Sequence, residues 1–592
     1  MNVHAQRLES LRALMREEGL AACLILTSDP HLSEYLPDFW KSRKWLSGFT
    51  GSAGSLVVTQ GYAALWADGR YWIQAEKELK GSGIELQKQT ASNTFVEWLS
   101  KNLAKGDLLA TDFKVLPLFL KRELEAKGLE LVSKDLVASI WTDRPALPNS
   151  PIYEHLESPH SRQEKLALVR EELDKKGATH NLLVTLDDIA WLCNLRGSDV
   201  PYNPVFLSFF LLSKDEATLF TDLAKIPSSL RAKLEGEGLG LAPYDSLDGA
   251  LAGLRGARVL LDSLRTTSYL ADLVAKNNDL IDDMNPSQLL KACKSDKELD
   301  HIKEAMVHDG VALCKLFAWL EETLESGQRV SELDIGEKAT HFRSQSPLYI
   351  SDSFSTIAGF NANGAEPHYS ATKESFSYLD GQGLLLVDSG GQYTKGTTDI
   401  TRVVPIGQPT AAQKRDYTLV LKAHIALARA SFPAGISMPL LDSITRAPLW
   451  KEGLNYIHGT GHGVGYFLNV HEGPQVISYL ANPLPRMQAM AGMVSSIEPG
   501  VYRAGKWGVR LENLVANVPV KNPKETDFGD FLCFETLTLC PFEPSCIDLS
   551  ILTCDEKDWV DDYHSKVKLA LEDKLEGRAR EWLLRRVAPL AR

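Results

Sequence analysis

The sequence has few of the features that mark secreted or disulfide-stabilised proteins. Its eight cysteines are spread over 592 residues, with no CxxC pair and no zinc-ribbon spacing. Because disulfide frameworks and cysteine-based metal sites leave such patterns, we expect reduced, mostly buried thiols in a cytosolic protein. The N-terminal residues contain mixed charges and no apolar core before a small-residue cleavage site, so we predict no secretory signal.

Long apolar runs and an excess of basic residues are also absent. The longest apolar stretches, such as VFLSFFLL at 205–212, fall well short of the roughly 20 residues that span a bilayer. The net charge is −13 and the pI about 5.6, which does not favour a broad basic surface for nucleic acid. We therefore predict a cytoplasmic protein with no membrane or nucleic-acid partner.

The chain is too long for one hydrophobic core, and two of its segments resemble each other. Residues 11–36 and 166–195 each contain an amphipathic helix, a glycine, an apolar strand and an acidic turn. We interpret them as the starts of two related α/β domains. Between them, residues 142–161 contain four prolines, which is typical of an extended linker.

A third domain is predicted from the capping-box sequence SDKE at 295–298, which precedes apolar residues at helical spacing. From about 345, short apolar strands alternate with glycine-rich turns around a helical stretch at 411–430, which indicates an α+β fold with antiparallel hairpins. Beyond 550 the chain turns polar and helical. The predicted fold class is therefore α/β and α+β multidomain, with domains at 1–145, 160–290 and 295–592, the last carrying a C-terminal extension at about 530–592.

The sequence HGTGHGVG, from His458 to Gly465, places two histidines four residues apart. Four glycines in eight residues disfavour a helix by roughly 1 kcal/mol each relative to alanine. In an extended segment the two histidines would share a face but lie about 13 Å apart. We therefore expect at most one of them to bind a given metal ion. A glycine-rich turn with structural histidines is the alternative.

Two hairpins on either side of this motif carry paired carboxylates. In LLLVDSGGQYTKGTTDITRVV, a hairpin centred near Gln392 to Thr394 would place Asp388 and Asp399 roughly opposite each other. In the second hairpin, Glu498 and Glu512 are equidistant from Gly505. Because opposed like charges destabilise a ladder, and buried ones far more, we expect a compensating cation.

Four carboxylates and one histidine suit a site with two divalent metal ions, since the charges balance. Oxygen-rich ligands favour Mn²⁺, and the imidazole leaves Co²⁺, Zn²⁺ and Fe²⁺ open. A single pair of acidic residues beside a turn would be unremarkable, but two such hairpins around a histidine motif point to a functional site. Two close ions activate a bridging water and stabilise a developing oxyanion.

These residues resemble the five-ligand signature of the pita-bread metallopeptidases, a family that includes methionine aminopeptidase, prolidase and aminopeptidase P. The resemblance to cytosolic-type aminopeptidase P extends along nearly the whole chain, through SGFTGSAG (47–54), ADGRYW (67–72), IAWLCNLRGSDVPYNPVF (189–206) and the segment 533–564. It implies two creatinase-like N-terminal domains, a pita-bread catalytic domain, peptide substrates with proline at the second position, and a homodimer.

Carried over residue by residue, the resemblance implies the metal ligands Asp388, Asp399, His462, Glu498 and Glu512. The implied reaction is attack of a metal-bridging hydroxide on the first peptide bond, with Glu498 as general base. His458, His368 in EPHYS and His471 in NVHEGP would contact the substrate or the tetrahedral intermediate. Arg510 would steady a ligand carboxylate, as groups outside the ligand set generally do.

Other residues have simpler interpretations. His424, in a helical stretch, is expected to be structural, and SGFTGSAGS is expected to be a turn because no Lys-Ser/Thr follows it. Arg70 could shape the entrance to the active site and bind substrate, or form an ion pair that stabilises the fold. The tryptophan-rich C-terminal helix is expected to pack or to form a dimer face. The alternative functions are a prolidase, which cleaves only dipeptides, and a pita-bread module that binds peptides without cleaving them.

Overall fold

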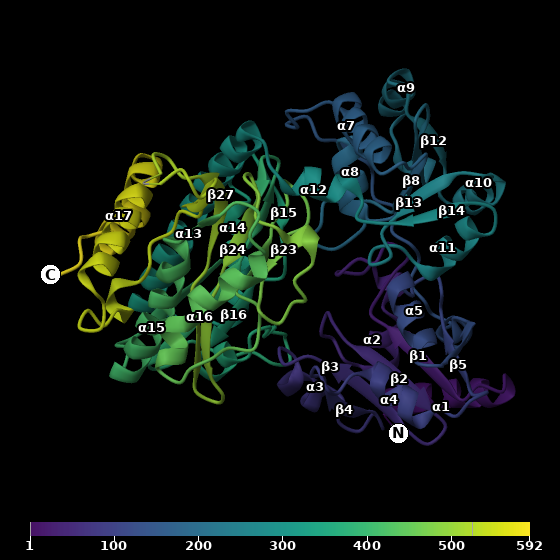
Figure 1. The fold of residues 1–592 in the computed structure, drawn as a ribbon. Helices are drawn as coiled ribbons and strands as arrows, with labels where there is room; N and C mark the ends of the chain where they lie inside the picture. Colours follow the sequence, from purple (N-terminus) through teal and green to yellow (C-terminus); the bar gives the residue numbers. More distant parts are fainter. Residues whose placement is uncertain (1, 524, 592) are drawn as a thin grey trace. The chain divides into compact units, whose positions relative to one another are not determined.

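The computed structural model describes residues 2–523 and 525–591, which form two compact units, Met1–Ser287 and Gln288–Arg592 (Figure 1). Among these residues every helix is too short or too polar to cross a membrane. The eight cysteines are all free thiols; five are buried, Cys293 and Cys533 are half-buried, and Cys554 is exposed.

The first unit contains two six-stranded sheets with the same topology. In both, three antiparallel strands occupy one part of the sheet and the remaining neighbours pair in parallel. This repetition confirms the predicted pair of related α/β domains. The first sheet has the order β4-β3-β2-β1-β5-β6, with β1 (Ala22–Leu26), β2 (Ser55–Thr59), β3 (Ala63–Ala67), β4 (Glu85–Lys88), β5 (Leu108–Thr111) and β6 (Glu130–Ser133). The second has the order β12-β11-β10-β8-β13-β14, with β8 (His180–Leu183), β10 (Ser208–Ser213), β11 (Ala217–Thr221), β12 (Gly240–Pro243), β13 (Arg258–Leu261) and β14 (Asp279–Asp282).

A helix precedes the first strand of each domain, as the repeated segments predict. These are α1 (Val3–Glu17) and α7 (Arg162–Lys175), and α7 begins with a capping box at Ser161. In the first domain, Leu11 of α1 packs on one face of the sheet and Leu99 of α4 (Phe95–Asn102) on the other. The proline-rich linker is largely irregular, with only the short strand β7 (Tyr153–Glu154). The domain boundaries given above stay predictions.

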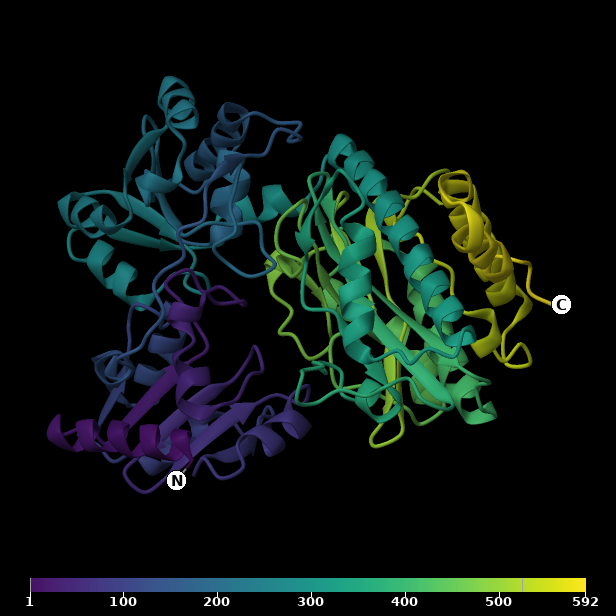
Figure 2. The same ribbon diagram turned by 180° about the vertical axis from the view of Figure 1, so that it is seen from behind.

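The second unit opens with three helices, α12 (Pro286–Ala292), α13 (Asp296–Glu325) and α14 (Glu332–Arg343). The predicted capping box at the start of α13 is present: Ser295 and Glu298 exchange hydrogen bonds between side chains and backbone. Figure 2 shows α13 lying along one side of this unit. The mostly apolar inward face of α13, from Leu299 to Leu320, explains its burial.

The remaining strands of the second unit form antiparallel sheets, which confirms the predicted α+β architecture. A three-stranded sheet pairs β16 (Ile357–Phe360), β17 (Gly383–Ser389) and β20 (Ile400–Ile406). A six-stranded sheet has the order β21-β28-β27-β24-β22-β23. Its strands are β21 (Ser431–Pro433), β22 (Gly461–Gly463), β23 (Glu472–Ile477), β24 (Val494–Ile497), β27 (Asn513–Pro519) and β28 (Phe531–Thr536). A second three-stranded sheet has the order β15-β18-β19, with β15 (Tyr349–Asp352), β18 (Gly391–Tyr393) and β19 (Gly396–Thr397). β25 (Gly500–Arg503) pairs with β26 (Trp507–Arg510), and the helices α15 (Ala411–Ala428) and α16 (Asp442–Lys451) accompany the sheets.

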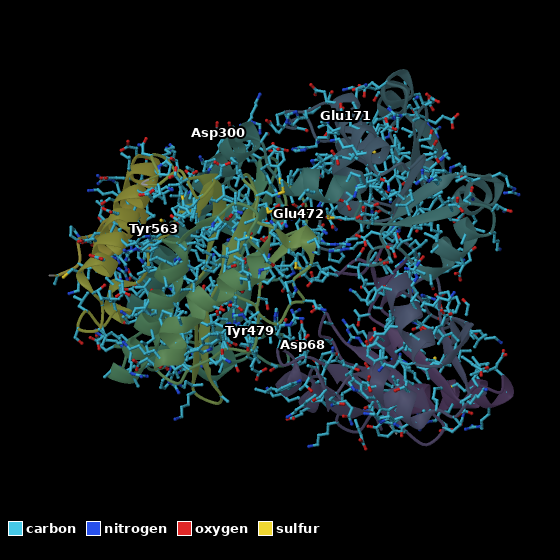
Figure 3. The ribbon with its side chains drawn as sticks, viewed as in Figure 1. Asp68, Glu171, Asp300, Glu472, Tyr479 and Tyr563 are labelled. Carbon is cyan, nitrogen blue, oxygen red and sulfur yellow. The ribbon has the colours of Figure 1, made fainter. Side chains whose placement is uncertain are left out.

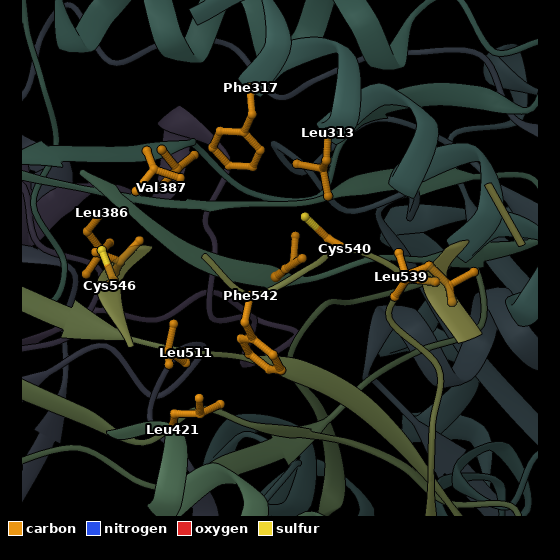
Figure 4. Close-up of a cluster of buried hydrophobic side chains, with 14 of the residues drawn as sticks. Leu313, Phe317, Leu386, Val387, Leu421, Leu511, Leu539, Cys540, Phe542 and Cys546 are labelled. Carbon is orange, nitrogen blue, oxygen red and sulfur yellow. The ribbon is translucent and has the colours of Figure 1, made fainter. Parts of the chain in front are cut away.

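The C-terminal residues belong to the core of the second unit (Figure 4). The predicted helical segment is two helices, α17 (Cys554–Leu571) and α18 (Gly577–Arg586), separated by a short 3₁₀ turn. Phe542 is fully buried, and its ring lies 5.2 Å from that of Tyr563 on α17, which is labelled in Figure 3. Trp582 on α18 stacks on Phe317 of α13 at 5.6 Å. The tryptophans of this segment therefore pack within the unit.

We predict that Phe542→Ala destabilises the second unit by about 3–5 kcal/mol, because it leaves a cavity among well-packed aromatic rings. Phe528 is 77% exposed, and Phe528→Ala, the matched control, should stay within about 0.5 kcal/mol of the parent protein. Differential scanning calorimetry of the three proteins measures both effects. Equal unfolding temperatures for the two variants would show that the C-terminal segment contributes no core packing.

Candidate metal centre

The five predicted ligands lie on strands, or next to strand ends, of two sheets in the second unit. Asp388 is on β17, Asp399 immediately precedes β20, and His462 is the middle residue of β22. Glu498 follows β24, and Glu512 precedes β27. Backbone hydrogen bonds join these segments, since the Glu498 N–H donates to the Thr460 carbonyl at 2.8 Å and the Glu512 N–H to the Thr401 carbonyl at 3.1 Å. Residues far apart in the sequence are thus held in one place.

The first hairpin differs from its predicted register. Asp388 is paired with Thr401, so that Asp399 lies diagonally across the ladder from Asp388 and not directly opposite it. The reason is that the turn falls between Thr394 and Lys395, about one residue later than predicted, as the pair Tyr393 and Gly396 shows. A shift of two positions keeps both carboxylates on the same face of the ladder.

The second hairpin has the predicted register. Ile497 pairs with Asn513 on one side and Gly500 with Arg510 on the other, which places Glu498 opposite Glu512. The Ser496 hydroxyl donates to the Glu498 carboxylate at 3.1 Å. Glu512 accepts a hydrogen bond of 2.8 Å from the Thr401 hydroxyl.

The HGTGHGVG segment is extended, as its glycines predict. Gly461 to Gly463 form β22, which pairs with both β23 and β24. A Cβ atom on Gly461 would lie 1.9 Å from the Ser496 carbonyl oxygen, and one on Gly463 would lie 2.1 Å from that of Glu472. Only glycine permits these approaches, so the glycines let the strand bring His462 close to its neighbours.

His462 is surrounded by carboxylates. Its Nε2 lies 3.4 Å from an oxygen of Asp399 and 3.5 Å from an oxygen of Glu498. Ligand atoms of Asp399, His462 and Glu512 all lie within 4.8 Å of one another. One buried oxygen of Asp388 accepts no hydrogen bond from the described residues. An acceptor without a donor, facing other carboxylates, fits a site for divalent cations.

The electrostatics of the cluster lead to the same conclusion. Burial raises the pKa of Asp388 to about 7 although Arg510 opposes the shift, and burial also raises the pKa values of Glu498 and Glu512. For His462, burial lowers the pKa, but Asp399 and Glu498 outweigh it and raise the pKa to about 9. The cluster therefore holds positive charge tightly, as a metal centre must.

Arg510, the residue predicted to steady a ligand, donates to Asp388 at 2.6 Å and to the Thr401 hydroxyl at 3.2 Å. It also donates to the Tyr502 hydroxyl at 2.8 Å, and that hydroxyl lies 2.8 Å from Nε2 of His458. Because a carbonyl oxygen only accepts, Nδ1 of a neutral His458 donates to Gly459, and Nε2 then accepts a hydrogen bond from the Tyr502 hydroxyl. The neutral His458 ring then keeps its own proton on Nδ1, which faces the Gly459 carbonyl at 2.7 Å.

The other predicted site residues have different surroundings. His471 immediately precedes β23, and its ring centre lies 4.3 Å from that of His462. His368 is half-buried in the turn after the 3₁₀ helix Asn361–Ala365, which approaches β26 through Gly364 and Gly508. Arg70 belongs to the first unit and forms a two-fold ion pair with Asp68, each bond 2.8 Å. The stabilising ion pair, one of the two alternatives for Arg70, is thus observed, and its role at the entrance stays a prediction.

His424 is structural, as its place in a helix predicts. It is fully buried on α15, where Nδ1 lies 3.1 Å from the Ile497 carbonyl and the Asn513 amide lies 3.3 Å from Nε2. It therefore supports the two backbone segments that lead to Glu498 and Glu512. Burial lowers its pKa to about 3.

Two residues that contact the predicted site residues were missed by sequence reasoning. Tyr502 links Arg510 to His458, and Thr401 links Arg510 to Glu512. Thr401 could have been found from the strand period, since it lies two residues after Asp399 on the same face. Tyr502 carries no such signal, because its contacts depend on how β25 twists toward His458.

Comparisons with known proteins extend over the whole chain. The model of metallopeptidase family M24 matches residues 300–517, and models of the creatinase/prolidase N-terminal domain match 7–139 and 143–298. The C-terminal region of peptidase M24 matches 530–590. These matches confirm the predicted order of two creatinase-type domains and one pita-bread domain.

Named relatives are similar over nearly their full lengths. The chain is 39% identical to a probable Xaa-Pro aminopeptidase P of Laccaria bicolor, covering 99% of this chain and 93% of that protein. It is 37% identical to Xaa-Pro aminopeptidase 1 of Dictyostelium discoideum, covering 99% and 96%. The crystal structure of X-prolyl aminopeptidase from Caenorhabditis elegans, described as a cytosolic enzyme with a di-nuclear active site, matches with a TM-score of 0.94, 33% identity and 100% coverage of both chains.

We predict a pH-dependent effect of His424→Gln on the metal-free protein. Since the folded-state pKa of His424 lies below its unfolded value, its stabilising contribution is present above about pH 6.5 and is lost as the pH falls toward 3. The stability gap between wild type and variant should therefore shrink by up to about 1.4 kcal/mol per pH unit in that range. Calorimetry with Phe432→Ala as control, which truncates a buried ring that packs on Phe534, tests this. A gap that is constant with pH would contradict the buried neutral state.

Proposed function

The chain belongs to metallopeptidase family M24, and from this premise we propose that it removes the first residue from peptides whose second residue is proline. It is a metallo-aminopeptidase, and the proline preference comes from the relatives named above. The observation that carries the proposal is the cluster of four carboxylates, three of them buried, and one histidine in a chain aligned end to end with those enzymes.

We further propose that Asp388, Asp399, His462, Glu498 and Glu512 hold two divalent ions, with Mn²⁺ favoured by the oxygen-rich ligands. The di-nuclear site of the C. elegans enzyme supports the number of ions. Bound ions would supply a water of lowered pKa and positive charge opposite the developing oxyanion. In the metal-free chain, positive charge at this place comes from His462 and Arg510.

The side chains around the ligands would move protons and position the substrate. Glu498, partly buried and opposite Glu512, would accept the proton of the attacking water, because its raised pKa brings its proton affinity closer to neutrality. His471, beside His462, would donate to the oxygen of the tetrahedral intermediate. His368 would bind the substrate near its departing nitrogen, and Arg510 would keep Asp388 in place.

The proposed role of His458 requires one of its hydrogen bonds to be exchanged. In the neutral ring, Nδ1 donates to the Gly459 carbonyl and Nε2 accepts from Tyr502. Both nitrogens are thus engaged within the protein, so donation to the substrate carbonyl would require one of these two contacts to be replaced by one with the substrate. The Arg510–Tyr502–His458 chain links this ring to the carboxylate of Asp388.

Two other functions are less well supported. A prolidase would accept only dipeptides, but the three-domain length and the C-terminal extension correspond to the full-length aminopeptidase relatives. A binding module without catalysis would not need the complete set of four carboxylates and a histidine, which costs stability in the absence of a cation.

One assay separates these functions. We expect Mn²⁺-loaded protein to release arginine from Arg-Pro-Pro and to stop when a chelator is added. Cleavage of Ala-Pro alone would indicate a prolidase, and no cleavage of either peptide would indicate a binding module. Amino-acid analysis of the products gives the answer directly.

We predict that Glu498→Ala abolishes turnover, because it removes both a ligand and the proposed general base, which together contribute well over about 10²-fold. Glu337 is exposed on α14, and Glu337→Ala is the matched control that should keep the activity of the parent protein. Turnover retained by Glu498→Ala would remove the role assigned to this carboxylate.

We propose a cytoplasmic homodimer, with the location supported by the cytosolic C. elegans relative. Exposed apolar side chains gather on and beside α16, where Trp450 meets Tyr479 with ring centres 6.2 Å apart. Such a patch on a globular unit favours contact with a second copy. We call it the α16 patch; it comprises Leu440, Ile444, Trp450, Ile457, Tyr479 and Leu480.

The α16 patch is testable by light scattering after size-exclusion chromatography. We expect the parent protein to be a dimer and Trp450→Glu combined with Leu480→Glu to be a monomer, because each charge would be buried in the contact. Leu569 on α17 is 88% exposed and lies outside the patch, so Leu569→Glu should remain dimeric. A dimeric double variant would place the contact elsewhere.

A further inference from the structure

A second group of buried charges lies beside the metal centre and takes no part in the proposed reaction. The carboxylate of Glu472, labelled in Figure 3, contacts two lysines: Lys294 at 2.6 Å and Lys291 at 2.8 Å. The side chains of all three are at most 1% exposed. Lys291 lies on α12 and Lys294 directly before α13, at the start of the second unit.

The Glu472 carboxylate faces two buried lysines. Buried ion groups are costly unless their geometry is good, and they are often replaceable by apolar side chains without loss of stability. General stabilisation therefore does not explain the presence of this group. Lys294 also donates to the Val464 carbonyl at 2.8 Å.

This additional contact joins the two segments that carry His462 and His471. Glu472 follows His471 and opens β23, while Val464 is two residues after His462. The strands β22 and β23 are irregular at this point, since their register shifts between His462 and Gly463. A register shift leaves backbone groups without ladder partners, so the separation of the two rings depends on other contacts.

The backbone of Lys294 is held as firmly as its side chain. Its N–H donates to the Gly492 carbonyl at 3.0 Å, and a Cβ atom on Gly492 would lie 2.3 Å from the Lys294 carbonyl oxygen. Gly492 directly precedes the residues that lead into β24 and Glu498. Lys294 thus has fixed contacts with three segments that end in residues of the metal centre.

We propose that Lys294 and Glu472 are positioning residues, which hold the irregular β22–β23 pairing so that His462 and His471 face the same ions and substrate. Lys291 contacts the other oxygen of the Glu472 carboxylate. The expected effect of these residues on catalysis rests on the proposed function. Their expected effect on metal affinity does not depend on the substrate. Contacts of this kind around a ligand affect metal affinity about 10–100-fold.

Lys294→Met and Lys291→Met form a matched pair, because each leaves one buried lysine paired with Glu472. We expect Lys294→Met to weaken Mn²⁺ binding at least about tenfold by calorimetric titration. It should lower kcat for Arg-Pro-Pro to a similar extent with little change in KM, since His471 acts in the transition state. Lys291→Met should stay within about threefold of the parent protein in all three quantities.

A second variant reaches the same contact without removing a charge. Gly492→Ala should displace Lys294 and weaken Mn²⁺ binding in the same way. The matched control is Gly435→Ala, because Gly435 has φ of +78°, close to the +81° of Gly492, but has no atom within 4 Å of an added Cβ. Gly435→Ala therefore reproduces the strain of an alanine at positive φ but not the steric clash with Lys294.

The outcomes separate this proposal from the proposed function. If the parent protein binds Mn²⁺ but releases no arginine, the aminopeptidase proposal fails while the titrations still test Lys294. If Lys294→Met and Gly492→Ala bind Mn²⁺ as well as their controls do, the positioning role is wrong. Failure of the parent protein to bind Mn²⁺ would overturn the metal centre and this inference together.

Discussion

The second unit is organised around the mutual repulsion of four carboxylates, three of them buried and that of Glu498 partly buried. They would separate if their strands were free to move, and backbone contacts with other segments hold Asp388, Glu498 and Glu512 in place. The raised pKa values of the cluster show how strongly burial and neighbouring charge disfavour its ionised form. A bound cation relieves this repulsion. Without a cation the carboxylates could relieve it only by moving apart, and the surrounding fold resists that movement.

Two arginines provide much of that resistance. Arg510 holds the Asp388 carboxylate directly. Arg402 is fully buried and donates to the Glu512 carbonyl, to the Asn513 amide oxygen and to the Cys540 carbonyl. Through the last contact, and through Tyr563, the C-terminal segment supports the strand that carries Glu512. This segment is thus part of the structure that keeps the ligands together.

Glycine has a comparable role on the other side of the centre. Gly461 and Gly463 let β22 approach Ser496 and Glu472 more closely than any side chain would permit. The cost is a strand with few side chains to pack, so its position depends on contacts such as that of Lys294 with Val464. The glycines that let β22 approach its neighbours therefore also make its position depend on contacts from outside the strand.

Much of the fold and of the candidate centre was determined by the sequence itself. Strand and turn residues with a period of two placed Glu498 opposite Glu512, and the glycines of HGTGHGVG excluded a helix, because these are local properties of the chain. The repeated helix–strand pattern likewise identified two related domains.

Only the tertiary structure decided the register of Asp388 with Thr401, the Tyr502 link to His458 and the Lys294–Glu472 contact. A turn can shift by one residue without changing the apolar pattern of its strands, so the sequence leaves such a register open. Partners such as Lys294 and Glu472 are 178 positions apart. No local period or propensity connects residues at that distance; they meet because the packing of the whole unit brings their segments together.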